Sequence, residues 1–477
     1  MPLKAKILDP GVRSRAQMST STSEVIKEIE GDDPEDVLFN NLYGLRTIEL
    51  NRPNKLNSLN ASMIRKIVPR LVEWEKSDMA NVIVMKGAGE RAFCAGGDVG
   101  ELARQNQEGP GGQERSSEFF ALEYKLDHYI ATYQKPYIAF MDGITMGGGV
   151  GLSIHAPFRI ATERTVFAMP ETRIGFFPDV GASFFLPRMA GAIGTYLALT
   201  SENLIGANAF YSGIATHYLH STSLPNLESR LAELRFKDYY TMEERLAIIE
   251  MTIEEYATGL PHNEPMLLAG ELRKAIDRCF SKSSIGEIVA ALQREEGPTK
   301  AWAEETLATL RKRSPTSVHV ALEQMRVGKS WSIAETFRRE HQIAARFMRH
   351  SDFVEGVTTQ LSKERPTPNW QPATLEDIQP SDNIAEPFFR VSEDVPQLKL
   401  LNGRDYTEYP YRSFGAPTEK DVEDLVNQAT RTRREIRDEF VRRKKGRQGI
   451  STIVDEILAR KTRNDANGKA AWIYEDS

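Results

Sequence analysis

Cysteine is scarce in this chain, and its two cysteines lie far apart. Cys94 and Cys279 offer neither disulfide nor metal-ligand spacing, so a reducing compartment is the simpler assumption. Apolar runs of the roughly 20 residues needed to cross a bilayer are also missing, because the stretches 136–141 and 150–154 soon meet polar or charged positions. We therefore expect a globular protein without a membrane span, in which Cys94 is a small packing residue.

Motifs for nucleotide phosphates and for a serine or cysteine triad are missing too. The glycine-rich string 143–151 lacks the order G-x-G-x-x-G and has no Lys-Ser or Lys-Thr pair after its glycines. This excludes a dinucleotide fingerprint and a P-loop there. His155 and His217 have apolar neighbours, and we identify no nucleophilic Ser or Cys to form a triad with either. Both histidines are predicted to be core residues.

Positive charge is concentrated at two places, although the net charge of the chain is −6. Residues 431–447 carry nine Lys or Arg against three Asp or Glu, a local balance of +6. Residues 1–25 have four basic residues and one acidic residue before Glu24. The basic residues are Lys4, Lys6, Arg13 and Arg15. This composition weakly resembles an organelle-targeting segment, and a disordered, solvated tail explains it about as well.

Strands and helices are predicted to alternate between residues 37 and 169. Alternating polar and apolar residues in 37–51 predict two strands with a turn at Tyr43-Gly44. The apolar spacing of 61–76 predicts a helix capped by Asn60. The other elements predicted here are strands at 82–85, 137–141, 158–161 and 166–169, and helices at 118–133 and 150–155. This order is typical of an α/β fold with crossover connections.

Beyond residue 191 the pattern becomes mainly helical. The predicted helices span 194–199, 229–234, 242–256, 285–293, 299–313, 318–325 and 333–348. A Pro-rich stretch at 365–372 marks an edge, and we place a boundary near residue 390. We therefore divide the chain into a targeting or disordered segment, a catalytic core, a helical part and a charged extension, which span 1–34, 35–220, 221–390 and 391–477.

Two carboxylates lie eight positions apart in a segment crowded with glycine, proline and apolar residues. Glu171 and Asp179 belong to the string M-P-E-T-R-I-G-F-F-P-D-V-G at 169–181. Acids are rarely buried without a task. Two close acids also acquire separated pKa values, so that one is protonated while the other is not. We predict that this pair carries the chemistry, because a helix cap would explain Asp179 alone but not its partner.

Two glycine-rich loops precede the acid pair, each after a strand-like run. In 94–98 and 143–151 the lack of a Cβ lets backbone N–H groups approach an oxygen. If Gly97 and Gly148 aim their amides at one carbonyl oxygen, they form an oxyanion hole. Turn formation and close helix packing explain either loop alone. Both loops together with the acid pair favour a catalytic site.

These motifs resemble the crotonase (enoyl-CoA hydratase/isomerase) superfamily. The ordered set is A-G-G-D at 95–98, G-G-G at 147–149 and P-E at 170–171. Longer strings at 142–153, 167–187 and 352–357 narrow the resemblance to its 3-hydroxyisobutyryl-CoA hydrolases. It implies a crotonase-like α/β fold of repeated ββα units with a helical C-terminal layer. It also implies thioester hydrolysis of 3-hydroxyisobutyryl-CoA in valine breakdown, in the mitochondrial matrix, without a cofactor other than the coenzyme A of the substrate.

The resemblance assigns site residues one by one. Glu171 and Asp179 are the acids, with Glu171 either attacking the carbonyl or activating water, and the amides of Gly97 and Gly148 are the oxyanion donors. The residues expected to contact substrate are Glu123, Gly96, Gly147, Lys55 and Arg52, the last two toward the nucleotide. By its own neighbours in sequence, Glu123 fits a solvated helix face.

A hydratase of this superfamily would be expected to carry a second glutamate three residues after the middle glycine of the second loop. Gly151 stands at that position. One of the two acids needed to add water across a double bond is therefore absent. Enoyl-CoA hydration or isomerisation is the weaker enzymatic alternative.

Residues 391–477 extend beyond the resemblance and form the charged extension. The aromatic residues of 401–417 predict a segment laid over a surface, and the basic run 431–447 follows an acidic helix start. A solvated helix with Ile436, Phe440 and Val441 on its packed side explains the basic run. So does an attachment arm for RNA or an acidic protein. The contact residues would then be Arg442, Arg443, Lys444 and Lys445.

A second functional hypothesis comes from the same resemblance. Proteins resembling these hydrolases also occur in the small subunit of fungal mitochondrial ribosomes. A ribosomal role through the extension, alone or beside enzyme activity, is therefore the alternative from a different functional class.

Overall fold

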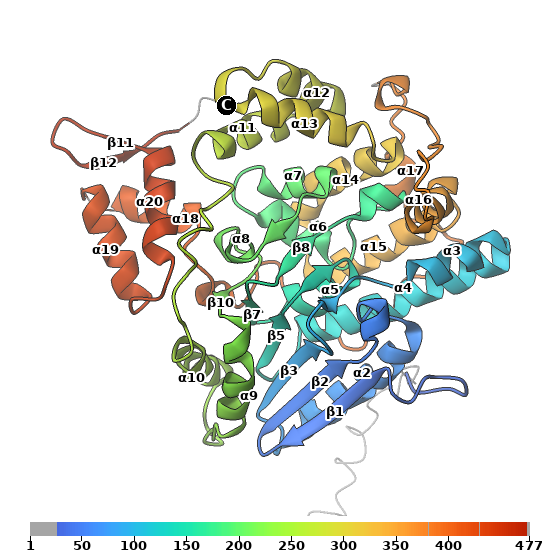
Figure 1. Ribbon diagram of the computed structural model, residues 1–477, viewed down its shortest axis with the longest axis horizontal. Coiled ribbons are helices and arrows are strands. Elements are labelled where there is room, and N and C mark those ends of the chain that lie inside the picture. The colour runs from blue at the N-terminus through green and yellow to red at the C-terminus, as the bar shows by residue number, and fades with distance from the viewer. Residues whose placement is uncertain (1–25, 380, 429, 475–477) are drawn as a thin grey trace, which may run out of the picture.

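A computed structural model describes residues 26–379, 381–428 and 430–474 (Figure 1). Residues 1–25, with the four basic residues on which the predicted targeting segment rests, lie outside the described residues. Within those three ranges, no helix combines the length and the apolar character that a membrane span requires.

The larger of two central sheets has six strands in the order β1-β2-β3-β5-β7-β10. Its strands are β1 (Val37–Leu42), β2 (Leu45–Leu50), β3 (Val82–Gly87), β5 (Tyr137–Met141), β7 (Phe158–Ala161) and β10 (His217–Tyr218). The β1–β2 hairpin is antiparallel, and the remaining pairs are parallel. All five residues of β5 are buried, as expected for a parallel strand that is covered on both faces.

The smaller sheet delivers the loops of the predicted site. Its order is β4-β6-β8-β9, with β4 (Ala92–Cys94), β6 (Ile144–Met146), β8 (Val166–Ala168) and β9 (Leu204–Ile205). Because β4, β6 and β8 run parallel, all three end at the same edge of the sheet. Each follows a strand of the larger sheet in the chain, β3, β5 or β7, and helices follow each pair. These are the repeated ββα units of the predicted crotonase-like fold.

Helices surround both sheets. In α2 (Ala61–Lys76) the side chain of Asn60 accepts a hydrogen bond from the Met63 amide at 2.8 Å, as predicted. The long α4 (Pro110–Ala131) packs along α15 (Ile333–Phe347) from the helical layer, and both contribute to the main apolar core. The other helices up to residue 390 are α3 (Val99–Gln107), α5 (Gly148–Ile154), α6 (Ala182–Phe185), α7 (Ile193–Thr200), α8 (Ala207–Tyr211), α9 (Leu224–Ala232), α10 (Met242–Glu254), α11 (Gly270–Phe280), α12 (Ile285–Gln293), α13 (Lys300–Leu310), α14 (Pro315–Val327), α16 (Ser351–Leu361) and α17 (Glu386–Phe389).

Most predicted elements are present, and several have the predicted bounds. These include β5, β7, α2 and α12. Four helix starts were wrong. α9 begins at Leu224 rather than at 229, and α14 begins at Pro315 rather than at 318. α4 begins at Pro110 rather than at 118, because proline suits the first helical position even when glycines follow it. α5 begins at Gly148 rather than at 150. α3, α11 and α16 were not predicted.

The first part of the extension lies across the helical layer. Leu398 is buried in the main apolar core. A carboxylate oxygen of Asp405 accepts a hydrogen bond at 2.9 Å from the amide of Ala334, in the first turn of α15. This part of the chain is therefore laid over a surface, as the aromatic content of residues 401–417 predicted.

The rest of the extension is a compact unit packed on the core. It comprises α18 (Glu419–Gln428), α19 (Arg433–Arg443), α20 (Ile450–Lys461) and the hairpin of β11 (Thr462–Asn464) and β12 (Ala470–Trp472). Ile436 and Phe440 of α19 are buried in one apolar cluster with Phe210 of α8 and Tyr218 of β10. Figure 1 shows this unit in red, at one side of the molecule. The basic run 431–447 thus belongs to a folded unit, and any attachment role concerns that unit's outer surface.

Arg447 ties this unit to α10. Its side chain is 2% exposed and lies 3.5 Å from a carboxylate oxygen of both Glu250 and Glu254. It also donates a hydrogen bond to the Phe414 carbonyl at 2.7 Å. Arg447 belongs to the basic run but has a structural role.

We expect Arg447→Met to lower the free energy of unfolding by about 2 to 3 kcal/mol. Breaking a wholly buried pair costs roughly 3 to 5 kcal/mol, and Glu250 and Glu254 keep some access to solvent. Arg442→Met is the matched control, since the Arg442 side chain is 74% exposed and surface pairs contribute up to about 1 kcal/mol. Chemical denaturation measures both, and equal effects of the two changes would contradict the anchoring role.

Candidate functional site

The parallel strands β4, β6 and β8 bring the two glycine loops and Glu171 together. Gly97 follows β4, Gly148 follows β6, and Glu171 follows β8. A Cβ built on Gly148 would lie 3.4 Å from the Gly97 amide nitrogen, and one built on Gly147 would lie 3.0 Å from Oε1 of Glu171. The loops therefore touch each other and the first acid. Gly147 also has a φ of +46°, a conformation that favours glycine.

The Gly97 and Gly148 amides have no backbone acceptor in the part of the chain that the structure describes. Leu59 donates to the Gly96 carbonyl at 2.8 Å and accepts from the Asp98 amide at 2.9 Å, so the N–H of Gly97 points away from Leu59. Gly148 is the first residue of α5, where an N–H has no intrahelical acceptor. Both amides are available to an oxygen of a bound molecule.

Glu171 and Asp179 are both buried, each with 4% of its surface exposed. Glu171 opens a short 3-10 helix, η3 (Glu171–Ile174), and its Oε2 has no hydrogen-bond partner in the structure. Burial, followed by the charge of Asp179, raises the pKa of Glu171 well above its usual range. Burial also raises the pKa of Asp179 to about 7, although the Tyr124 hydroxyl opposes this by donating to Oδ2 at 2.7 Å. Asp179 thus has a hydrogen-bond donor that favours its ionised form, whereas Oε2 of Glu171 has none.

Helix α4 adds two further buried acids. Glu123 is 2% exposed and Asp127, one turn later, is fully buried. The solvated helix face that its neighbours in sequence suggested for Glu123 is therefore wrong. A Cβ on Gly148 would lie 2.3 Å from Oε1 of Glu123, so this carboxyl reaches the loops. Tyr124 and Asp127 were not predicted as site residues. The feature that could have indicated them is the pair of acids, Glu123 and Asp127, four positions apart in an apolar helix.

Asp127 fills the space beside Gly151. A Cβ on Gly151 would lie 2.6 Å from Oδ2 of Asp127 and 2.8 Å from the Cβ of Val180. Both carboxyl oxygens of Asp127 lack a hydrogen-bond partner in the structure. Burial, followed by the charge of Glu123, raises the pKa of Asp127 well above its usual range. Burial therefore favours its protonated, neutral form.

The two residues predicted to contact the nucleotide have different surroundings. Arg52 pairs with Asp98 at 2.9 Å, directly after Gly97, and so braces the first glycine loop. Lys55 is exposed in the 3-10 helix η2 (Pro53–Lys55). Their contacts with coenzyme A stay a prediction.

His155, His217 and Cys94 are core residues, as predicted. All three are buried, and Nε2 of His155 lies 3.0 Å from the Val180 carbonyl oxygen. Burial raises the pKa of the Cys94 thiol to about 12, so it is not a nucleophile.

Some of the basic residues proposed as partner contacts already have partners within the extension. Arg442 and Arg443 both pair with Glu439 at 2.7 Å. Lys444 donates to the carbonyls of Ser413 and Gly415. Arg442, Arg443 and Lys445 are exposed, whereas Lys444 is half-buried.

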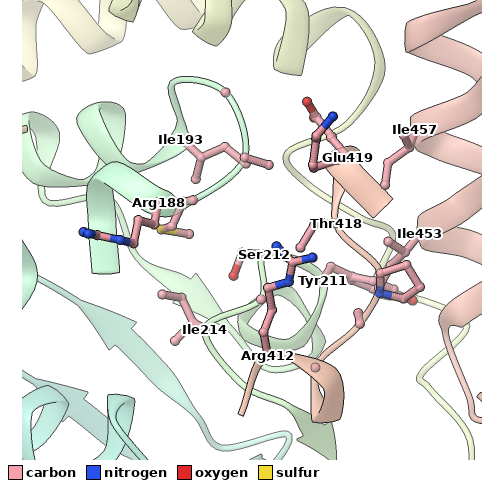
Figure 2. Close-up of a pocket in the computed structure, with 18 of the residues that line it drawn as sticks. Arg188, Ile193, Tyr211, Ser212, Ile214, Arg412, Thr418, Glu419, Ile453 and Ile457 are labelled. Carbon is pink, nitrogen blue, oxygen red and sulfur yellow. The ribbon is translucent and has the colours of Figure 1, made fainter. Parts of the chain in front are cut away.

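A cavity of about 770 Å³ lies between the core and the C-terminal unit (Figure 2). Its apolar wall includes Ile193 and Ile214 of the core and Ile453 and Ile457 of α20. Figure 2 shows these side chains facing one another across the cavity with Glu419 nearby. The acids and glycines of the predicted site do not line it, so this space is separate from them.

Comparison with known proteins identifies the family of the chain. The family profile described as enoyl-CoA hydratase/isomerase matches residues 45–389. The chain belongs to the crotonase family. Among solved structures, a carnitinyl-CoA dehydratase from Mycobacterium thermoresistibile is similar, with a TM-score of 0.67 and 33% identity over 77% of this chain and 100% of that one.

Two named relatives differ in how much of this crotonase-family chain they match. "Small ribosomal subunit protein mS47" of Neurospora crassa is 59% identical over 96% of this chain and 91% of its own. "3-hydroxyisobutyryl-CoA hydrolase, mitochondrial" of Gallus gallus is 41% identical over 75% of this chain and 90% of its own. The mitochondrial location predicted from the sequence is confirmed by such relatives.

We expect Asp127→Asn to raise the thermal midpoint of unfolding, and to raise it more at pH 8 than at pH 5. Because the folded-state pKa of Asp127 is raised, the unfolded chain releases this proton at lower pH than the folded chain. Stability is therefore lost as pH rises from the unfolded pKa toward the folded one. Asparagine keeps the shape and removes the titration. The control is Glu114→Gln, an exposed acid of the same helix, and a gain independent of pH would contradict a buried neutral acid.

Proposed function

We propose that this protein hydrolyses the thioester of a short β-hydroxyacyl-CoA, 3-hydroxyisobutyryl-CoA above all. The observation that carries the proposal is the meeting of two unused loop amides, Gly97 and Gly148, with the carboxyl of Glu171. A thioester carbonyl on these amides develops negative charge in the tetrahedral state, and loss of one such donor typically costs about 3 to 4 kcal/mol. The identity of 41% with a named hydrolase supports the choice of substrate.

Glu171 then acts in one of two ways. It attacks the carbonyl carbon, so that the CoA thiolate leaves and water hydrolyses the resulting mixed anhydride, or it takes a proton from the attacking water. Both routes need ionised Glu171, so kcat/KM rises with pH as its raised pKa is passed. Asp179, with a pKa of about 7, suits a proton relay to the leaving sulfur or a partner for the substrate hydroxyl. Coenzyme A enters only as part of the substrate, and these steps call for no other cofactor.

Hydration of an enoyl-CoA is the weaker proposal because of the space at Gly151. A glutamate there would collide with Asp127 and Val180. Asp127 of α4 already occupies that space.

We expect Glu171→Gln to abolish thiol release with little effect on folding, because it removes the ionisable group and keeps the shape. Asp179→Asn should lower kcat/KM at least about tenfold, which is about 1.4 kcal/mol. Free thiol is measured with several acyl-CoA esters, and Glu114→Gln should match the wild-type protein. Absence of thiol release with every β-hydroxyacyl-CoA would contradict the proposal, and hydration of an enoyl-CoA would favour the alternative.

A second candidate function is a place in the mitochondrial ribosomal small subunit. The observation that favours it is the alignment with mS47 of Neurospora crassa over 96% of this chain. An alignment of that length includes most of residues 391–477, whereas the hydrolase of Gallus gallus aligns with 75% of the chain. Glu171, Asp179 and both glycine loops are all present here, so the two roles are compatible.

If the C-terminal unit binds ribosomal RNA, reversing Arg442, Arg443 and Lys445 to Glu should release the protein from small subunits at lower salt. Each lost phosphate contact weakens binding and reduces its salt dependence. Lys444 is kept, because it supports the fold through two carbonyls. The control reverses Lys274, Lys300 and Arg311, which are exposed on the helical layer.

Co-sedimentation across a salt series, with hydrolysis assayed in parallel, separates the outcomes. Release of the first variant alone, with hydrolysis intact, is the expected result. Failure of the wild-type protein to sediment at low salt would contradict the ribosomal role. Loss of hydrolysis in the first variant would show that the unit serves the enzyme.

A further inference from the structure

The turn that carries Asp179 has a strained backbone. Val180 has a φ of +54° and Gly181 a φ of +90°. The left-handed region is unfavourable for a β-branched residue such as valine, and such conformations persist only where surrounding contacts impose them. The contacts that impose this one also determine where the Asp179 carboxyl lies.

Two side chains of the helical layer hold the turn by hydrogen bonds. Glu340 of α15 accepts hydrogen bonds from the amides of Gly181 at 2.7 Å and Ser183 at 2.9 Å. Gln324 of α14 donates to the Pro178 carbonyl, and also to the Ser183 hydroxyl at 2.8 Å. Both side chains have no exposed surface. The backbone is thus held immediately before and after Asp179.

Two groups of the catalytic core also contact the turn. Tyr124 donates to the Asp179 carboxyl at 2.7 Å, and Nε2 of His155 lies 3.0 Å from the Val180 carbonyl. A Cβ on Gly181 would lie 2.5 Å from the His155 ring, so the turn has no room to shift in that direction.

We propose that Glu340 and Gln324 are positioning residues, which hold the strained turn so that the Asp179 carboxyl faces the site formed by Gly97, Gly148 and Glu171. This inference rests on the proposed function and assigns a role in it to the helical layer. The hydrogen bonds of these two side chains go to residues 178, 181 and 183 and not to the carboxyl of Glu171 or Asp179. They act through the backbone of Asp179 and its neighbours.

Glu340→Gln separates this role from general packing. The amide keeps the size of the carboxyl, but its NH₂ group replaces one of two acceptors and faces a backbone N–H. The turn then loses one hydrogen bond. We expect kcat to fall between about tenfold and 100-fold, because a displacement of about 1 Å has effects of that size, while KM changes less than about twofold because both glycine loops are untouched.

Gln324→Met removes the hydrogen bonds that Gln324 donates to the turn, and it should lower kcat in the same way. The matched control is Glu335→Gln, an acid of the same helix α15 whose side chain is 42% exposed. The double variant Glu340→Gln with Asp179→Asn should be no slower than Asp179→Asn alone, because residues acting through one group are not additive. A further fall in the double variant would overturn the proposal.

Amide hydrogen exchange provides a readout that does not depend on activity. Residues 178–185 should exchange faster in Glu340→Gln and Gln324→Met than in the wild-type protein or Glu335→Gln, without a change elsewhere in the catalytic core. Unchanged exchange, or unchanged kcat with wild-type hydrolysis present, would overturn the proposal. A wild-type protein that hydrolyses no acyl-CoA would instead remove the proposed function, and the exchange data would still decide whether these residues hold the turn.

Discussion

Burial of several carboxyl groups in one place is the constraint on which this structure depends. Glu123, Asp127, Glu171, Asp179 and Glu340 are each at most 4% exposed. Removing a carboxylate from water is unfavourable unless hydrogen bonds or opposite charges compensate, and burial is the largest cause of the raised pKa of every one of them. The fold therefore favours the protonated forms of these acids, and Tyr124 gives Asp179 a hydrogen-bond donor that favours its ionised form.

The ββα units and the helical layer provide different members of this cluster. The ββα units provide the glycine loops and Glu171 through the shared edge of three parallel strands, which is a local consequence of chain order. The helical layer provides Glu340, for which burial raises the pKa to about 8 although two backbone amides donate to it. Both parts are needed for one acid pair to occupy a dry space in a defined orientation.

The sequence was sufficient for those parts of the site that follow from local pattern. Glycine loops after strand-like runs, the acid pair and the family resemblance led us to expect Gly97, Gly148 and Glu171 in one site. The short strands β4 and β6, whose shared edge brings them together, were not predicted. Tyr124, Asp127, Gln324 and Glu340 could not be predicted in the same way, because their roles depend on which helix packs against which turn. Likewise α2 and β5 followed from periodicity and a cap, whereas the packing of α19 on α8 and β10 depends on contacts more than 200 positions apart in the chain.

The packing of the C-terminal unit has a consequence for the order in which the protein is made. Phe210 and Tyr218 belong to a cluster that α18, α19 and α20 complete, so these aromatic side chains remain uncovered while residues 419–461 are still being synthesised or imported. A chain cut short before α18 would keep an apolar face that the intact protein hides. Chaperones and proteases recognise such faces. The addition of α18, α19 and α20 therefore determines whether the protein escapes binding by chaperones and degradation.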